Sequence, residues 1–372
     1  MRINTCKFSL LSLVLVLGFA VSHASAKQMR GINFVSVPFT HAPYTSIRAK
    51  ASLEHLKSTG AEWISIPIVW YQDGVNYSEM HPLKEVVSTF TSVNRSPSDK
   101  EIRGILKLAQ ELDLKVMLVP RVEINRPGWI RSSHIGEGMV PYQVRRWFEN
   151  YTEFLLQMAK YASAYKVDLL SIGHDLHHMS HFEDFWKDAI KKIKEVYKGN
   201  LTYSASSRNE FRQIGFFDEL DYIGLIADEK FDINAEESVE SILKKFEPFV
   251  EKIKYLKKLW KKPALITRAV RSGYFERRED QSGKVREIDH ASQERYFEAL
   301  HQAAGPEVEG VFFGDWSADP AHGGEKDGSI SPQYKRGEMA IRKIFEADVE
   351  LPKKPDEESP KMYCKYCVEI DL

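Results

Sequence analysis

The 372-residue sequence is poor in cysteine, carries no excess of either charge, and has no long hydrophobic run after its first 26 residues. Its 52 Lys and Arg residues are balanced by 53 Asp and Glu, and no nucleic-acid recognition motif occurs, so nucleic acid is not expected as a partner. No later apolar segment approaches the roughly 20 residues of a membrane span. A content of 43% hydrophobic and 28% charged residues excludes disordered and fibrous classes and indicates a globular protein.

The three cysteines do not form a redox site by sequence criteria. Cys6 lies near the N-terminus, and Cys364 and Cys367 form a C-x-x-C in the last nine residues. A redox C-x-x-C requires a βαβ context and a helix N-terminus that lowers the thiol pKa, and neither pattern precedes this one. A local disulfide, or one to a partner, is the preferred interpretation. The surrounding residues 349–372 are rich in Pro, Lys and Glu and are predicted to form a flexible tail.

Residues 1–26 have the pattern of a secretory signal peptide. Arg2 and Lys7 supply the positive charge, residues 8–21 are apolar, and an Ala-Ser-Ala cleavage site ends at residue 26. The apolar stretch of 14 residues is too short for a membrane anchor. We therefore expect a mature protein that begins near Lys27 and is secreted to the extracellular side.

Four N-x-[ST] triplets, in polar or loop-like stretches, indicate a glycoprotein. They begin at Asn76, Asn94, Asn150 and Asn200.

Short apolar runs alternate with amphipathic segments along the mature chain. The predicted strands are residues 31–35, 63–70, 115–120, 169–173, 201–205, 222–227, 264–267 and 311–313. The predicted helices include residues 98–112, 142–165, 182–197, 239–261 and 291–304. Eight strand–helix alternations with continuously apolar strands predict one (β/α)₈ TIM barrel over residues 27–348. The alternative is an open doubly wound sheet, but no G-x-G-x-x-G follows any strand.

In such a barrel the functional residues follow the C-terminal ends of the strands. At these ends the sequence has Trp70, Tyr71, Arg121, Glu123, Asp175, Ser206, Asp228, Arg268, Asp315 and Trp316. Aromatic rings beside carboxylates suit a sugar, because a pyranose stacks its C–H face on rings while its hydroxyls need polar partners. A carbohydrate is therefore the expected partner, although Trp63, Trp70 and Trp316 could equally be packing residues.

Several short motifs, in order, resemble glycoside hydrolase family 113, the retaining β-mannanases with a (β/α)₈ barrel. The motifs are residues 30–34 (RGINF), 58–61 (STGA), 70–72 (WYQ), 96–99 (SPSD), 114–118 (LKVML), 201–203 (LTY), 221–224 (DYIG), 262–263 (KP) and 331–332 (SP). The resemblance covers nearly all of residues 30–346 and implies a glycosidase-like barrel that binds β-linked glycans.

This chain departs from the family at both catalytic positions. The family's acid/base Glu lies in a Gly-Thr-Glu-Leu motif, where this chain has Gly-His-Asp-Leu with Asp175. The nucleophile Glu follows Thr on the seventh strand, where this chain has Arg268. A guanidinium has no available lone pair and remains protonated, so it cannot attack an anomeric carbon. Asp175 can donate a proton but is one methylene shorter. An ion pair between Arg268 and Asp175 would weaken that acid further.

Sugar-contacting positions also differ from the family. Arg121 replaces a His, Ser206 an Asn, and Asp228 a Tyr, while the family's Trp-Trp on the last strand reads Phe313-Gly314. Mannan specificity therefore does not transfer from the resemblance.

Three functional interpretations follow, and none needs a cofactor except the last. The first is a pseudoglycosidase that binds β-linked glycans without cleaving them. The second is an inverting glycosidase with Asp175 as acid and a relocated base, Glu123, Asp228 or Glu229. The third is a hydrolase that uses Zn²⁺ held by the four histidines and the carboxylate of residues 174–181, although no H-E-x-x-H motif is present.

Overall fold

A computed structural model describes residues 28–36, 42–84, 95–125, 132–227, 233–234, 236–279 and 283–355. The predicted signal peptide, Asn94, Asp228, Glu229 and the C-x-x-C lie outside the described residues.

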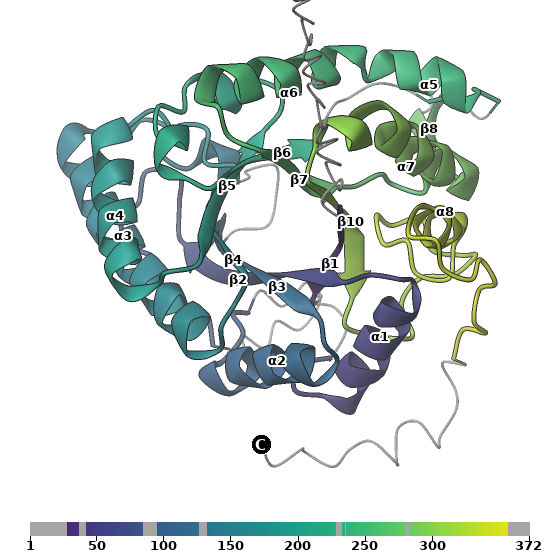
Figure 1. The fold of residues 1–372 in the computed structure, drawn as a ribbon, viewed down its shortest axis with the longest axis horizontal. Coiled ribbons are helices and arrows are strands. Elements are labelled where there is room, and N and C mark those ends of the chain that lie inside the picture. Colours follow the sequence, from purple (N-terminus) through teal and green to yellow (C-terminus); the bar gives the residue numbers. More distant parts are fainter. Residues whose placement is uncertain are drawn as a thin grey trace, which may run out of the picture.

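Eight parallel strands close into a barrel in the order β1-β10-β7-β6-β5-β4-β3-β2. Helices surround this ring on its outside (Figure 1). The barrel strands are β1 Met29–Val35, β2 Trp63–Gln72, β3 Lys115–Ile124, β4 Leu169–His174, β5 Asn200–Ser206, β6 Tyr222–Ala227, β7 Ala264–Ala269 and β10 Gly310–Ser317. Every predicted strand lies within one of these, so the TIM-barrel prediction is confirmed. The strands were recognisable because parallel strands covered by helices are apolar along most of their length.

The described residues contain eight α-helices, among them the five predicted segments. They are α1 Ile47–Ser58, α2 Asp99–Glu111, α3 Pro141–Ala164, α4 Glu183–Val196, α5 Val239–Lys245, α6 Glu247–Trp260, α7 His290–Ala304 and α8 Arg336–Ile344. The N-terminus of α2 has a reciprocal cap, in which the Ser98 side chain accepts from the N–H of Glu101 while the Glu101 carboxylate accepts from the N–H of Ser98. The single helix expected over residues 239–261 is corrected to two, because Pro248 in the first turn of α6 begins a new helix after Phe246.

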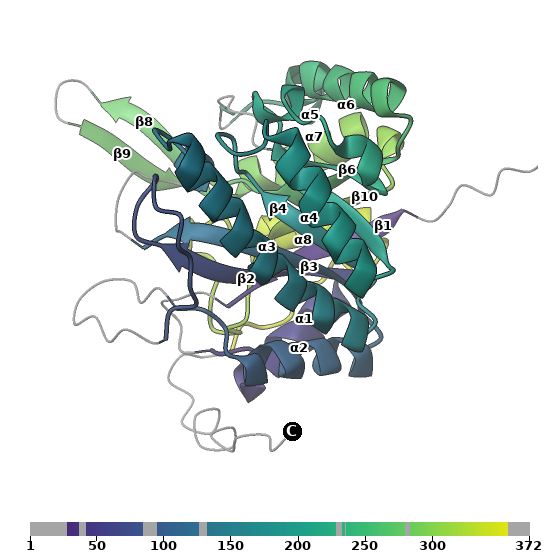
Figure 2. The same ribbon diagram turned by 90° about the vertical axis from the view of Figure 1, so that its left-hand side faces the viewer.

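An antiparallel hairpin, which the sequence did not predict, follows β7. It comprises β8 Tyr274–Glu279 and β9 Gly283–Ile288 and projects from the barrel (Figure 2). Its base is attached to the loop after β10, where the N–H of Gly273 donates to the carbonyl of Gly328 at 3.1 Å. The hairpin therefore stands beside the end of β7, the strand that carries Arg268.

The N-x-[ST] triplets do not all lie in loops. Asn150 lies inside α3, and its side-chain amide donates to the carbonyl of Ser78 at 2.9 Å. Asn200 opens β5, whereas Asn76 is exposed outside any helix or strand. The expectation of loop-like positions is corrected for Asn150 and Asn200, which belong to α3 and β5.

None of the helices in the described part of the chain has the length and apolar character required to cross a bilayer.

Candidate functional site at the barrel mouth

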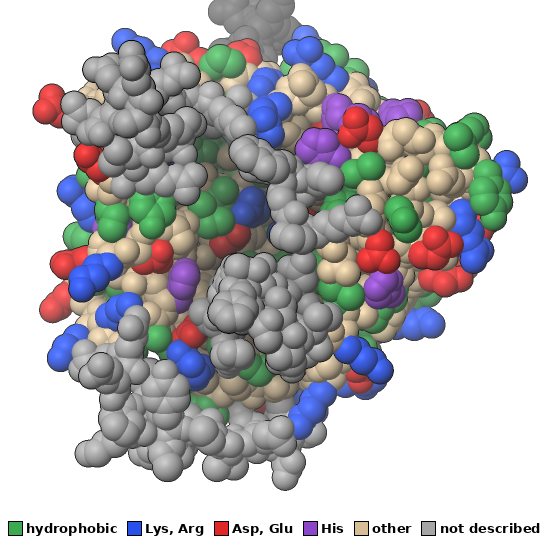
Figure 3. Space-filling model, turned by 180° about the vertical axis from the view of Figure 1, so that it is seen from behind, with side chains coloured by type: hydrophobic (Ala, Val, Ile, Leu, Met, Phe, Trp, Pro, Cys, Tyr) green, Lys and Arg blue, Asp and Glu red, His purple; other side chains and the backbone are tan. Residues whose placement is uncertain are grey.

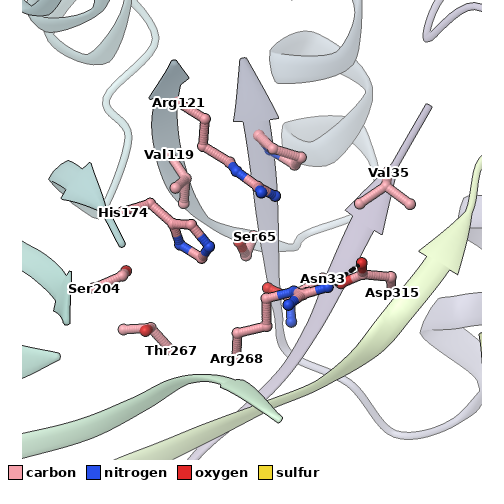
Figure 4. A pocket seen from close by; sticks show the side chains of 11 residues that line it. Asn33, Val35, Ser65, Val119, Arg121, His174, Ser204, Thr267, Arg268 and Asp315 are labelled. Carbon is pink, nitrogen blue, oxygen red and sulfur yellow. Dashed lines mark hydrogen bonds and ion pairs between the residues drawn. The ribbon is translucent and has the colours of Figure 1, made fainter. Parts of the chain in front are cut away.

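A hollow of about 280 Å³, part of it open to solvent, lies among the C-terminal halves of the strands. This volume includes open solvent, and the part enclosed among the side chains is small. The lining residues come from seven of the eight strands and are Asn33, Val35, Ser65, Pro67, Val119, Arg121, His174, Ser204, Thr267, Arg268 and Asp315. Figure 4 shows most of these side chains converging on one space.

The depth of the hollow follows from the layers of side chains inside the barrel. A lower layer is bulky and apolar and includes Trp63, Met117, Leu169, Leu265 and Phe312. Above it, the side chains are small and polar, as at Ser65, Ser204 and Thr267. Bulky residues close the bottom of the barrel, whereas the small ones leave space above them. This change in side-chain size places a polar hollow over an apolar floor.

Arg268 and Asp315 form a two-point ion pair at one side of the hollow. Nε of Arg268 donates to Oδ1 of Asp315 at 3.0 Å, and Nη2 donates to Oδ2 at 2.6 Å. Burial alone would lower the pKa of Arg268, but the charge and hydrogen bonds of Asp315 raise it. Arg268 therefore keeps its positive charge, and its partner in this geometry is Asp315 rather than Asp175.

Local irregularities of the strands bring this pair together. The register of β7 shifts against β6 between Leu225 and Ile226, and that of β10 shifts against β7 between Val311 and Phe313. Such bulges turn the end of a strand and redirect its side chains. Thr267 and Arg268 consequently both line the hollow although they are adjacent in sequence.

Arg121 on β3 lies across the hollow from Arg268 (Figure 4). Its Nη2 donates to Oε1 of Glu123 at 2.6 Å, and both side chains are mostly buried, with 22% and 28% exposure. Its Nε is buried and has no hydrogen-bond partner among the described residues. A buried N–H without a partner is costly, so this atom is a candidate ligand contact.

His174, the last residue of β4, contributes its ring to the hollow between the two arginines (Figure 4). The side chain is buried, and this burial, reinforced by the positive charges of Arg121 and Arg268, lowers the pKa of His174 well below its usual range. The imidazole is therefore neutral at pH 7. A neutral ring can accept or donate one hydrogen bond to a ligand without adding a third positive charge.

Asp175 follows β4 with a positive φ of 49°, a conformation uncommon for residues other than glycine. Its N–H donates to the carbonyl of Ser204 at 3.0 Å, and it is not among the residues that line the hollow. The register of β4 against β5 shifts between Ser171 and His174. This bulge aims His174 into the hollow, while Asp175 lies at the strand end beside it.

Glu210 is a buried carboxylate that sequence reasoning missed. It lies in a short 3-10 helix, Glu210–Arg212, after β5, and it accepts hydrogen bonds from the N–H of Leu176 at 3.0 Å, the N–H of Ser206 at 2.7 Å and the hydroxyl of Tyr203 at 2.5 Å. Burial, reinforced by the charge of Asp175, raises the pKa of Glu210 to about 8. Glu210 thus joins the loop that carries Asp175 to the end of β5. A lone Glu in an unremarkable turn carries no sequence signal for this role.

The aromatic residues predicted to touch a sugar pack largely elsewhere. Trp316 has no exposed surface, and its Nε1 donates to Oγ of Ser52 in α1 at 3.1 Å. Trp70 stacks on Phe154 of α3, with ring centroids 4.4 Å apart. Both rings therefore contact the helix layer, the packing alternative considered for them.

Tyr71 and Ser206 are buried beside the hollow rather than lining it. Burial, followed by the charge of Glu123, raises the pKa of Tyr71 to about 12. Ser206 is 6% exposed and donates its N–H to Glu210. Of the predicted site residues, the structure brings Arg121, Arg268 and Asp315 together around the hollow, with Glu123 bonded to Arg121 at its edge.

The histidines after β4 do not converge as metal ligands. Across the described ranges, no group of three or more His, Cys, Asp or Glu side chains has an arrangement that could hold a metal ion. The rings of His177 and His178 meet edge to face, with centroids 5.2 Å apart, and His181 contacts Phe182. His174 points instead into the barrel hollow. The local sequence density of histidine therefore does not produce a shared site.

Comparisons with known proteins agree with this geometry at the level of fold. The sequence profile of Glycoside Hydrolase Family 113 matches residues 36–331. A solved structure of a GH113 β-1,4-mannanase superimposes with a TM-score of 0.70 at 19% identity, covering 87% of this chain and 100% of the other. The GH113 β-mannanase of Alicyclobacillus acidocaldarius, in complex with ManMIm, gives 0.69 at 18% identity, covering 87% and 98%.

A more distant solved structure is also similar. The β-glucuronidase of Ruminococcus gnavus, in complex with uronic deoxynojirimycin, superimposes with a TM-score of 0.55 at 12% identity, covering 86% of this chain and 49% of the other. No curated protein sequence matches the chain significantly.

Proposed function

The chain belongs to glycoside hydrolase family 113, and from this premise we propose that its barrel mouth binds β-linked glycans without retaining hydrolysis. The observation that carries the proposal is the two-point ion pair of Arg268 with Asp315 at the end of β7. The family resemblance assigns the nucleophile to the position of Arg268. Retaining hydrolysis needs two carboxyl groups about 5 to 5.5 Å apart, one of which attacks the anomeric carbon. A guanidinium cannot attack, and its charge opposes the positive charge of an oxocarbenium-like transition state.

The acid side of the site supports the same proposal. The resemblance assigns the acid/base role to the position of Asp175, which is one methylene shorter than Glu and does not line the hollow. The neutral ring of His174 occupies the lining next to it. A misplacement of about 1 Å in a catalytic group can reduce a rate roughly a hundredfold. A residual acid at Asp175 would therefore be a poor catalyst even with a nucleophile present.

The two alternatives have less support from the described residues. An inverting mechanism needs a free carboxylate to activate water, but Glu123 is bonded to Arg121 and Asp315 to Arg268. Asp228 and Glu229 lie outside the described residues. A metal-dependent mechanism needs converging ligands, and the histidines after β4 do not converge within the described part of the chain.

We also propose that the protein is secreted, as the pattern of residues 1–26 indicates. If it passes through a glycosylating secretory pathway, we expect Asn76 to be modified, because it is exposed outside any helix or strand. Asn150 should remain unmodified, since its amide is bonded to Ser78.

Glycan binding and hydrolysis should be measured on the same purified protein. Solved structures similar to this chain include β-1,4-mannanases, so β-1,4-linked manno-, glucomanno- and chitin-type oligosaccharides are the first ligands to test. We expect binding on a glycan array without retaining turnover above background, because loss of a catalytic nucleophile typically costs 10⁴ to 10⁶ in rate, as an order of magnitude. Absence of any glycan binding would refute the proposed function.

Rebuilding the catalytic pair gives a second test. Arg268→Glu alone should remain inactive, because Asp175 is still too short. Arg268→Glu with Asp175→Glu restores both carboxyl groups, and we expect weak retaining turnover from this double variant. Robust hydrolysis by the unmodified protein that is lost in Asp175→Asn would contradict the proposal and favour the inverting mechanism. Loss of activity on chelation would favour the metal-dependent mechanism.

A further inference from the structure

We propose that the hollow selects a glycan with an anionic group, a uronic carboxylate or a sulfate ester, which Arg121 and Arg268 receive between them. This inference rests on the proposed glycan-binding function and adds the class of sugar. It departs from a site for a neutral mannan, in which such a charge has no role.

The first support is the hydrogen-bonding state of Arg121. Of its donor nitrogens, only Nη2 has a partner among the described residues, the Glu123 carboxylate. Nε is buried and unpartnered in the same part of the structure. An arginine presents its N–H groups in a planar fork that matches the two oxygens of a carboxylate or sulfate. Arg121, which lines the hollow, therefore has donor nitrogens that Glu123 does not occupy.

The second support is the charge of the lining. Two guanidinium groups line the hollow, but only one carboxylate does, that of Asp315. Both oxygens of Asp315 are bonded to Arg268, which leaves Nη1 of Arg268 outside the pair. Glu123 and Asp175 lie near the arginines but outside the lining. The lining itself thus carries two positive charges and one negative charge, and the carboxylate that pairs with Arg121, that of Glu123, lies outside it.

The third support is the absence of a competing acid among the other lining residues. Ser65, Ser204 and Thr267 offer hydroxyls, and Asn33 offers an amide whose nitrogen donates to the carbonyl of Gly314 at 2.9 Å. His174 contributes a neutral ring between the two arginines (Figure 4). Seen from behind, the molecule shows basic and acidic side chains side by side near the middle of the face (Figure 3). Sugar hydroxyls can bond to the neutral groups while the arginines take the anion.

Three tetrasaccharides with the same β-1,4 linkage and ring configuration isolate the effect of charge. They are mannotetraose, its C6 carboxylate counterpart mannuronate tetraose, and 6-O-sulfated mannotetraose, each titrated calorimetrically against the full-length secreted protein. We expect at least one anionic ligand to bind tenfold or more tighter than mannotetraose, because charge-assisted hydrogen bonds are roughly twice as strong as neutral ones. The carboxylate and sulfate arms distinguish the two sources of the anion.

Variants at Arg121 test the residue itself. Arg121→Gln should weaken binding of the anionic ligand roughly 10- to 100-fold, and by more than it weakens binding of mannotetraose. Arg121→Lys keeps the charge without the planar fork and should recover only part of the loss. Arg103→Gln is the matched control, since Arg103 is an exposed arginine on α2 that pairs with Asp99. It should bind like the unmodified protein.

The outcomes separate this inference from the proposed function. Equal or tighter binding of mannotetraose overturns the inference and leaves glycan binding intact. Anion preference that survives in Arg121→Gln also overturns it, provided that the circular dichroism spectrum and melting temperature show a folded variant. Tight binding of free acetate or sulfate with no gain from the sugar would mean that the hollow is an anion site and not a glycan site. No binding of any glycan refutes both proposals.

Discussion

Replacement of Glu210 by Gln should change the pH dependence of folding stability in a defined direction. The carboxylate is completely buried, and burial together with the nearby charge of Asp175 raises its pKa from 4.5 to about 8. Because the folded state holds this proton more tightly than the unfolded chain, the stabilisation is complete below pH 4.5 and is lost as the pH rises through 8.

The size of the pKa shift also determines how much folding stability is lost. At 1.36 kcal/mol per pH unit of pKa difference, a rise from 4.5 to about 8 corresponds to about 5 kcal/mol in total. Between pH 5 and pH 8, both states titrate in part, so Glu210 should lower the free energy of unfolding by about 3 to 4 kcal/mol as an order of magnitude. Gln cannot titrate, and this portion of the slope should disappear from the Glu210→Gln variant.

Urea denaturation at pH 5, 6, 7 and 8, followed by tryptophan fluorescence, measures the free energy of unfolding directly. Trp147 and Trp186 are completely buried and report loss of the core. The difference between the unmodified protein and Glu210→Gln removes the contributions of all other titrating groups. Glu54→Gln, on an exposed position of α1, is the matched control and should follow the unmodified curve.

Asp175→Asn tests independently whether the charge of Asp175 contributes to the raised pKa of Glu210. Removing its charge removes one of the causes that raise the pKa of Glu210, so the decline in stability should be smaller in total and end at a lower pH. Parallel curves for the unmodified protein and Glu210→Gln across the whole range would show that Glu210 is ionised in the folded protein, and the reasoning would be wrong.

Three further predictions concern packing and processing. Gly173→Ala should destabilise the fold by roughly 1 to 3 kcal/mol in a thermal melt, because an added Cβ would lie 2.5 Å from the ring of Tyr203; an unchanged melting temperature would contradict the packing described. Trp316→Phe should lower the free energy of unfolding by roughly 1 to 3 kcal/mol, because the hydrogen bond to Ser52 is lost. Its glycan affinity should be unchanged, since the ring has no exposed surface, and weaker glycan binding by the folded variant would argue against this. Intact-mass measurement of secreted protein should give an N-terminus near Lys27, and recovery of Met1 on cytosolic protein would rule out the signal peptide.

The eight barrel strands were predictable because burial on both faces makes each strand a continuous apolar run, which is a local property of the sequence. Helix α1 was not among the predicted segments. Its buried face includes the polar residue Ser52, which interrupts the apolar pattern that marks a helix in a sequence. The Ser52 hydroxyl donates to the carbonyl of Ser317 at 2.5 Å, so a long-range hydrogen bond stands where an apolar contact was expected. The hairpin β8–β9 was missed because its strands are highly charged and lack the apolar alternation that marks a half-buried strand.

The candidate site was predictable only as a set of strand ends. The sequence placed Arg121, Asp175, Arg268 and Asp315 at the mouth, because in this fold the residues after each strand meet at one end of the barrel. The tertiary structure alone decided that Arg268 pairs with Asp315, 47 residues away, and that His174 rather than Asp175 lines the hollow. Those outcomes depend on one-residue shifts in strand register, which redirect side chains without changing the hydrophobic pattern that a sequence displays. Apolar burial is thus encoded in each segment separately, whereas the pairing of charges depends on how distant segments are aligned.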